Sequence, residues 1–187
     1  LLGIAFIETG ELFVADGAAG TIYSFNRSAN NPSNAAIFAS GVPGANSMAF
    51  DKNGNLWVSD GITGLGRVWK ITGPQANCTS APAVNCEEVF RVQAMANDVI
   101  NVSGVGGVGR DIRGLPQGAI NLSSRFAANT EGSTPIVANG LAFDHDGNKL
   151  FIADTARGAI WQATFNHGGE LKSKTGCETT FTPNTAC

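Results

Sequence analysis

The chain has 187 residues, of which 43% are hydrophobic, and this is enough for one domain with a sizeable core. Only 14% of the residues are charged and the net charge is −3, so no basic stripe is present to bind a nucleic acid backbone or an anionic membrane. The sequence contains no apolar run of about 18 residues that would span a bilayer, and its 24 glycines without a Gly-X-Y period favour an all-β protein with many tight turns.

Residues 3–45 form the first unit of a repeated pattern. The unit contains three short apolar runs separated by turn residues, at 3–6, 11–16 and 20–23. Such runs predict three strands of an antiparallel meander. The second run is apolar without alternation from Leu12 to Ala15, which is typical of a strand buried on both faces.

Residues 46–93 repeat this pattern, and Asp16 and Asp60 occupy the same place in the two units, 44 residues apart. A fixed period of this length, with three or four short strands in each unit, is typical of the blades of a β-propeller. The run at 87–92 suits the outer strand of the second blade, and we expect it to pair with the strand at 68–72.

The last unit covers residues 139–187 and contains three similar apolar runs, at 141–143, 150–153 and 159–161. Asp154 lies 94 residues after Asp60, which is close to two periods. We therefore expect one degenerate blade over residues 94–138, with its first strand at 96–102. Within it, we expect residues 104–133 to form a long loop or irregular insertion.

These units predict a single all-β domain over residues 1–187, a β-propeller with about four blades of a six-bladed ring. Because blades bury both faces by stacking on their neighbours, the remaining blades or a second chain are needed to close the ring. The chain begins inside a repeat and without an initiator Met, so we expect a mature or partial chain.

The four cysteines fall into two close pairs, Cys78 with Cys86 and Cys177 with Cys187. The spacing predicts two local disulfides, although four cysteines allow three connectivities. A zinc site fits less well because no C-x-x-C motif occurs. Disulfides predict a secreted protein, extracellular or periplasmic, and four glycosylation-type motifs agree with secretion, at Asn26, Asn77, Asn101 and Asn121.

Two common catalytic or cofactor motifs are not supported. Residues 104–109 read G-x-G-x-x-G, but Gly114 and Pro116 interrupt the helix that a dinucleotide site needs directly after the motif. No G-x-S-x-G motif occurs, and His145 and His167 lie in turn sequences. We therefore predict neither a nucleotide site nor a catalytic triad.

Asp16, Asp60 and Asp154 each end the second strand of a unit. They are either metal or substrate ligands at the rim of the propeller or turn formers that accept backbone hydrogen bonds. Their presence in every clear unit favours turn formation, because a site on the axis is rarely built from every blade alike.

Asn46, Asn97 and Asn139 each lie just before the first strand of a unit. In a propeller this strand is the innermost one, so side chains from different blades can converge at the axis. Amide oxygens are neutral ligands that suit calcium, which takes about six to eight oxygens. The alternative, that each Asn only forms a turn before the strand, stays open.

The pair Asn139-Gly140, together with the run at 150–155, resembles the blade motif of the family of senescence marker protein, gluconolactonase and luciferin-regenerating enzyme. Members of this family are six-bladed propellers, distantly similar to paraoxonases. The resemblance implies that Asn139 is a ligand of a central divalent metal, usually calcium. Repeat propellers of the NHL type share the Leu-Tyr-Val-Ala-Asp pattern and are the nearest competing family.

Asn46-Ser47, followed by the run at 56–61, resembles the Asn-Asp blade of the same family, while Asn97-Asp98 keeps the Asn-Asp pair itself. Which of the two corresponds stays open. Two acidic ligands of the family have no match: a Glu from an early blade, and an Asp-Gly ligand thought also to act as base. Leu2 occupies the comparable place in the first repeat.

The sequence thus leads to two hypotheses. The first is a hydrolase of a lactone or related ester that depends on calcium or another divalent metal, held by Asn46 and Asn139 with Asn97 in reserve, with a carboxylate base that the sequence does not identify. The second is a non-catalytic secreted propeller that acts as a binding or scaffold module, which the missing acidic ligands favour.

Overall fold

The computed structural model describes residues 1–26, 35–63, 66–91, 138–155 and 159–172. Every regular element within these residues is a β-strand, so the predicted all-β class is confirmed. Among the described residues there is no helix with the length and apolarity of a membrane span.

The first sheet, sheet 1, contains the N-terminal meander and has the strand order β1-β2-β3-β4-β8. Its strands are β1 (Ile4–Phe6), β2 (Leu12–Asp16), β3 (Thr21–Phe25), β4 (Ala36–Ser40) and the short β8 (Ala76–Asn77). The first four are antiparallel neighbours, whereas β8 comes from the second unit and adds to β4 in parallel.

Sheets 2 and 3 repeat the same meander. Sheet 2 consists of β5 (Ala45–Phe50), β6 (Leu56–Asp60), β7 (Arg67–Ile71) and β9 (Cys86–Arg91) in that order. Sheet 3 consists of β10 (Ala138–Phe143), β11 (Lys149–Asp154) and β12 (Ala159–Thr164). The antiparallel pairing of β7 with β9 confirms the predicted outer strand.

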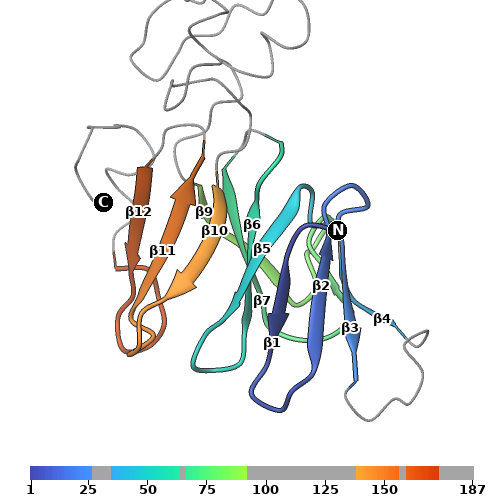
Figure 1. The fold of residues 1–187 in the computed structure, drawn as a ribbon, viewed down its shortest axis with the longest axis horizontal. Coiled ribbons are helices and arrows are strands. Elements are labelled where there is room, and N and C mark those ends of the chain that lie inside the picture. Colours follow the sequence, from blue (N-terminus) through green and yellow to red (C-terminus); the bar gives the residue numbers. More distant parts are fainter. Residues whose placement is uncertain (27–34, 64–65, 92–137, 156–158, 173–187) are drawn as a thin grey trace, which may run out of the picture.

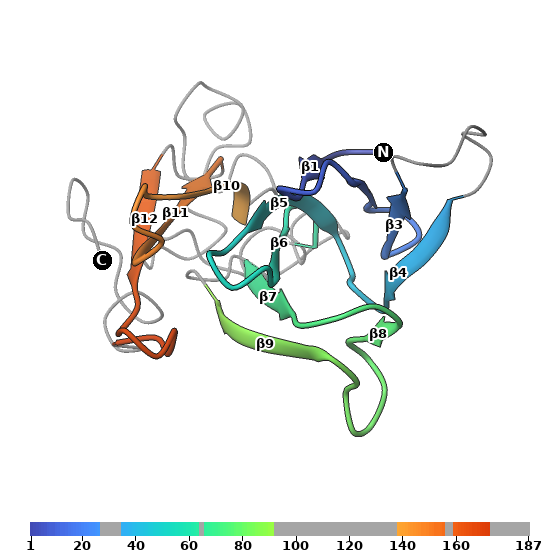
Figure 2. The same cartoon turned by 90° about the horizontal axis from the view of Figure 1, so that it is seen from below.

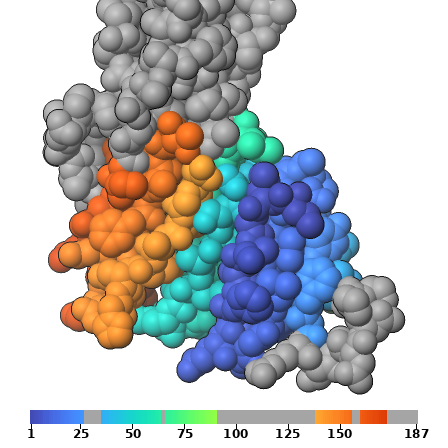
Figure 3. Space-filling view, in the orientation of Figure 1, coloured from blue at the N-terminus to red at the C-terminus, as the bar shows by residue number. Residues whose placement is uncertain are grey.

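The three sheets stand side by side, with sheet 2 in the middle (Figures 1 and 3). Their first strands, β1, β5 and β10, lie next to one another along one side, as the inner strands of consecutive propeller blades do (Figure 2). The degenerate blade expected over 94–138 falls almost entirely outside the described residues. In the described part β10 lies directly against β5, so sheets 2 and 3 are immediate neighbours.

The core lies in two layers, one on each side of sheet 2. Leu56 and Val58 of β6 are fully buried and belong to the layer shared with sheet 1, whereas Trp57 belongs to the layer shared with sheet 3. Continuous apolar character in β6 therefore reflects burial on both faces, as predicted.

Asp-rich turns join the first two strands of sheets 2 and 3. The carboxylate of Asp51 accepts the backbone N–H groups of Asn53 and Asn55, each at 2.9 Å. Gly54 then has φ of 79°, a left-handed conformation that favours glycine. The turn after β10 uses Asp144 and Gly147 in the same way, which explains why the sequence repeats Asp-x-(Asn/Asp)-Gly-Asn at this point.

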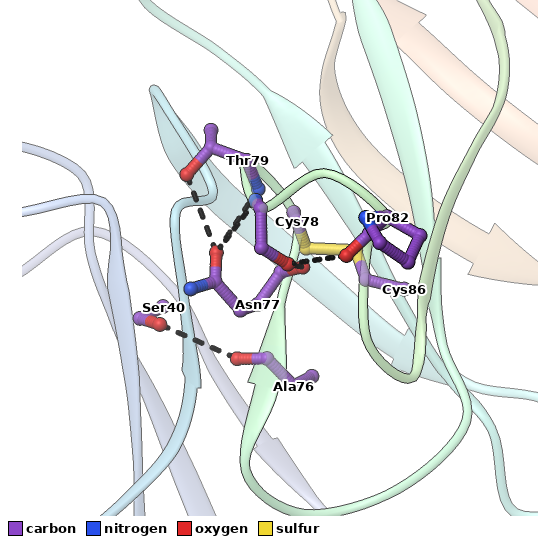
Figure 4. The surroundings of a disulfide bond; sticks show 8 residues. Ser40, Ala76, Asn77, Cys78, Thr79, Pro82 and Cys86 are labelled. Atoms are coloured by element: carbon purple, nitrogen blue, oxygen red, sulfur yellow. Dashed lines mark hydrogen bonds between the residues drawn. A yellow bond between two sulfur atoms is a disulfide. The ribbon is translucent and has the colours of Figure 1, made fainter.

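A disulfide joins Cys78 to Cys86, as the spacing predicted (Figure 4). Cys78 follows β8 of sheet 1, and Cys86 is the first residue of β9 in sheet 2. The loop is further ordered by Asn77, whose side-chain oxygen accepts the backbone N–H groups of Thr79 and Ser80, each at 3.1 Å. The second predicted disulfide, Cys177 with Cys187, lies outside the described residues.

Candidate functional site

Asn46 of β5 and Asn139 of β10 meet between sheets 2 and 3. The amide nitrogen Nδ2 of Asn46 donates a hydrogen bond to Oδ1 of Asn139 at 2.6 Å, although the two residues are 93 positions apart. Both side chains are half-buried. The structure thus brings together two of the three asparagines that the sequence singled out, and the third, Asn97, lies outside the described residues.

A β-bulge places each of these asparagines. The pairing of β5 with β6 shifts register between Ala45 and Met48, and the pairing of β10 with β11 shifts between Ala138 and Leu141. Each interval contains the asparagine and its successor. Bulges turn a side chain away from the regular alternation of a strand and are common beside active sites. The same irregularity in two repeats therefore aims two amides at one point.

The Asn139 side chain is held from both sides. Its amide nitrogen donates to Oγ1 of Thr155 at 2.8 Å, so its oxygen points towards Asn46. The Asn139 backbone carbonyl accepts a hydrogen bond from Oγ of Ser59 at 2.5 Å. These contacts fix the orientation of the amide before any ligand binds.

Asn46 is held by close packing against glycine. A Cβ at Gly61 would overlap the amide nitrogen of Asn46, and a Cβ at Gly3 would overlap its backbone oxygen. Gly3 precedes β1, so all three sheets contribute to the surroundings of Asn46. Glycine is required at both positions because the backbones approach too closely for any side chain.

Two serines complete the contact between the sheets and were missed by the sequence reasoning. Oγ of Ser47 accepts the backbone N–H of Leu141 at 3.0 Å, and Oγ of Ser59 accepts the backbone N–H of Ser47 at the same distance. The sequence did contain a signal for the role of Ser59, because the other two clear repeats have an alanine at this position, Ala15 and Ala153.

The three repeated aspartates act within their own sheets. Asp16 accepts the backbone N–H groups of Ala18 and Ala19, at 3.1 and 3.0 Å. Asp60 is buried, accepts the backbone N–H of Thr63 at 3.0 Å and forms an ion pair with Nε of Arg67 at 2.8 Å. Asp154 accepts the indole N–H of Trp161 at 2.9 Å.

The favoured interpretation of these aspartates as turn formers is confirmed for Asp16 and Asp60, whose carboxylates cap the turns that follow them. His145 and His167 are both exposed, as expected for turn residues. The Gly-rich motif at 104–109 lies outside the described residues.

The donors around Asn46 and Asn139 fit part of a calcium site. Two amide oxygens from neighbouring sheets are suitable neutral ligands, and an oxygen that accepts one hydrogen bond keeps a second lone pair. In the described part of the chain, no group of three or more His, Cys, Asp or Glu residues could hold a metal ion. Carboxylate ligands would therefore have to come from residues outside the described part of the chain.

No protein-family model and no curated protein matches the chain. Several solved structures do, among them a luciferin-regenerating enzyme, which is 13% identical over 96% of this chain and 48% of its own, with a TM-score of 0.48. Virginiamycin B lyase from Staphylococcus aureus is 11% identical over 91% of this chain and 39% of its own, with a TM-score of 0.42.

A putative 6-phosphogluconolactonase from Bacteroides uniformis is 15% identical over 93% of this chain and 53% of its own, with a TM-score of 0.35. The chain thus spans about half the length of these proteins or less. At these identities and TM-scores, the likenesses say nothing of activity.

Proposed function

We propose that the protein is a propeller hydrolase of a lactone or related ester, in which Asn46 and Asn139 are ligands of a divalent cation, most simply calcium. One observation carries this proposal: two equivalent bulges on neighbouring inner strands bring the two amides together. A structural turn residue would not need to meet its counterpart from another repeat. The disulfide between Cys78 and Cys86 supports secretion into an oxidising compartment.

A divalent cation bound at this point would polarise the substrate carbonyl and lower the pKa of a bound water. The role of the protein is then to supply neutral oxygen ligands in fixed positions. Thr155 and Ser59 orient Asn139, and Gly61 leaves room for Asn46, so little reorganisation is needed on binding.

The base that would activate water is not among the repeated aspartates described above. Asp60 is committed to Arg67, and Asp154 accepts the indole N–H of Trp161. Both carboxylates are thus used in contacts within their own sheets rather than directed at the asparagine pair. The proposal therefore needs a carboxylate from outside the described residues, both as a ligand and as the base.

The second candidate is a non-catalytic propeller that binds or scaffolds. It is favoured by a specific observation, namely that the amides of Asn46 and Asn139 hydrogen bond to each other without any acidic group in the described set of contacts. In that case the asparagine pair joins two blades and has no role towards a ligand.

Asn139→Asp and Asn139→Ala in the full-length protein separate these candidates. Calcium binding is measured by titration calorimetry, and hydrolysis is measured with a panel of lactones and aryl esters. If the amides bind a cation, Asn139→Ala weakens binding and hydrolysis by about tenfold or more, whereas Asn139→Asp retains binding because a carboxylate replaces the amide oxygen.

The matched control is Asn53→Ala, which removes an exposed asparagine side chain from a turn. It should leave both measurements unchanged. Equal calcium binding by wild type and Asn139→Ala would contradict the proposal that Asn139 is a metal ligand. Calcium binding that depends on Asn139 without hydrolysis of any tested substrate would favour the binding or scaffold module.

A further inference from the structure

The three sheets stack in one direction, and the second strand of each sheet shows this. The leucine of this strand and the residue two positions after it define one face, here called the leucine face: Leu12 and Val14 in sheet 1, Leu56 and Val58 in sheet 2, and Leu150 and Ile152 in sheet 3. The residue directly after the leucine defines the opposite, aromatic face, and is Phe13, Trp57 or Phe151.

Both junctions are built alike. The leucine face of sheet 2 packs on the aromatic face of sheet 1, since Leu56 and Val58 share a buried cluster with Phe13. The leucine face of sheet 3 packs on the aromatic face of sheet 2, since Leu150 and Ile152 share a cluster with Trp57. Leucine face on aromatic face is therefore the repeating junction.

Among the described residues, no sheet packs on the two outer faces, of opposite kind, at the ends of the row. The leucine face of sheet 1 exposes Ile4 by 66%, Phe6 by 63% and Ile37 by 58%. The aromatic face of sheet 3 exposes Ile160 by 60%. The counterparts inside the stack are buried: Met48, at the position of Ile4, is 6% exposed, and Val68, at the position of Ile160, is 0% exposed.

One aromatic contact recurs at each junction and is incomplete at the ends. Phe50, the last residue of β5, packs edge-on against Phe13 with ring centroids 5.0 Å apart. Phe143 of β10 packs against Trp57 in the same way at 5.8 Å. Phe6 holds the corresponding place in β1, and Phe151 holds the place of Phe13 and Trp57 on the face of sheet 3 that points away from sheet 2.

We propose that the leucine face of sheet 1 docks on the aromatic face of sheet 3 of a second copy of the chain, with Phe6 over Phe151. The two faces complement each other in the same way as the two junctions already present. Sheets 1 and 3 stand at opposite ends of the row in Figure 1, so two copies can exchange both contacts around a two-fold axis. The three described sheets of each copy would then give six sheets in one ring, and the degenerate blade expected over 94–138 would not be one of them.

This inference does not depend on the proposed function, and its test is the mass of the full-length protein in solution. Sedimentation and light scattering should give twice the mass of one chain for the wild type. Phe6→Asp and Phe151→Asp should each weaken the association by about a hundredfold or more, because a carboxylate would be buried against an aromatic ring. Ile160→Asp provides a second variant on the face of sheet 3.

Val84→Asp is the matched control, because Val84 is 46% exposed in the disulfide loop and belongs to neither face. It should keep the two-copy mass. Mixing the Phe6→Asp and Phe151→Asp proteins should restore part of the association, because one of the two contacts is then fully wild type. Circular dichroism confirms that each variant is folded.

A single-chain mass for the folded wild type would overturn the proposal, and would mean that further blades of the same chain, or no blade, cover these faces. A two-copy mass that neither Phe6→Asp nor Ile160→Asp reduces would also overturn it, because the copies would then associate through another surface.

Discussion

Sheets 2 and 3 are copies of one repeat that stabilise a buried carboxylate by different means. In sheet 3, Asp154 accepts the indole N–H of Trp161 at 2.9 Å. In sheet 2, Arg67 forms an ion pair with Asp60, and Trp69, at the position of Trp161, has a buried indole N–H without a hydrogen-bond partner among the described residues.

The two sheets also differ at the first residue of their third strand. Sheet 2 has Arg67 where sheet 3 has Ala159, and the guanidinium group reaches the carboxylate that the indole would otherwise bind. Arg67 also lies over the ring of Trp69, with 5.4 Å from Cζ to the ring centroid. Two repeats can thus share a backbone while their buried carboxylates bind different partners. The shared sequence pattern does not reveal this difference.

Arg67→Ala gives sheet 2 the residue of sheet 3 and should have the largest effect. It leaves the fully buried Asp60 without its charged partner, which costs about 3–5 kcal/mol in the free energy of unfolding. Urea unfolding followed by tryptophan fluorescence measures the loss. A loss below about 1 kcal/mol would show that the N–H of Trp69 takes over, and that the two sheets are interchangeable.

Replacing each tryptophan by phenylalanine compares the two indole N–H groups directly. Trp161→Phe removes one hydrogen-bond donor to Asp154, whereas Trp69→Phe removes an N–H without a partner in the described structure. Both variants lose similar volume, so Trp161→Phe should be less stable than Trp69→Phe by about 1–3 kcal/mol. Equal stabilities in urea unfolding would contradict the assignment of the Trp161 hydrogen bond.

Ser59→Ala gives sheet 2 the alanine that sheets 1 and 3 have at this position. The change removes the hydroxyl that joins Ser47 to the backbone of Asn139, and should cost about 1 kcal/mol. The control is Ser40→Ala, whose hydroxyl makes only a long contact of 3.4 Å to Ala76. Thermal unfolding should show a clear loss for Ser59→Ala alone, and equal losses would argue against a bridge between sheets.

The smallest expected effect on stability concerns Asp144, in the turn between β10 and β11 of sheet 3. The backbone N–H of Lys149, above all, lowers the pKa of Asp144 below its ordinary value of 3.8. A lowered pKa in the folded state means that the carboxylate contributes stability above the ordinary pKa, and that this is lost as the pH falls through the folded-state value.

We therefore expect Asp144→Asn to be slightly less stable than the wild type at neutral pH, with the difference vanishing once the pH falls below the lowered folded-state pKa of Asp144. Because the group is exposed, the difference should be small. Unfolding curves at several pH values measure it. A difference that grows on acidification would contradict the hydrogen-bonded carboxylate.

The strands and their burial followed directly from the sequence, because Leu12–Asp16 and its two copies carry the same apolar run and the same turn residues. The meeting of Asn46 and Asn139 could also be predicted from their place near the start of an inner strand, although each is the second residue of its strand rather than a residue before it. The bulges that aim them could not, because a bulge depends on the pairing of two strands rather than on one pattern.

Other features depend on packing across the chain. The degenerate blade predicted over 94–138 lies almost entirely outside the described residues and stays a prediction. That β10 lies against β5 could not be predicted, because spacing along a chain does not say which units become neighbours in space. Asp60 pairs with Arg67 rather than with Trp69, and this depends on how far each side chain reaches within a buried layer. That reach cannot be read from the sequence alone.

The link between Cys78 and Cys86 has a mechanical consequence. It holds the end of β8 beside the start of β9, whereas β8 is joined to the rest of sheet 1 by the pairing of Ala39 with Ala76 and of Ser40 with Asn77. Sheet 3 is joined to sheet 2, in the described part of the chain, by packing and hydrogen bonds only. Under a pulling force, the loop between Cys78 and Cys86 would stay closed, whereas the short pairing of β8 with β4 and the contacts between sheets 2 and 3 have no covalent link among the described residues to hold them.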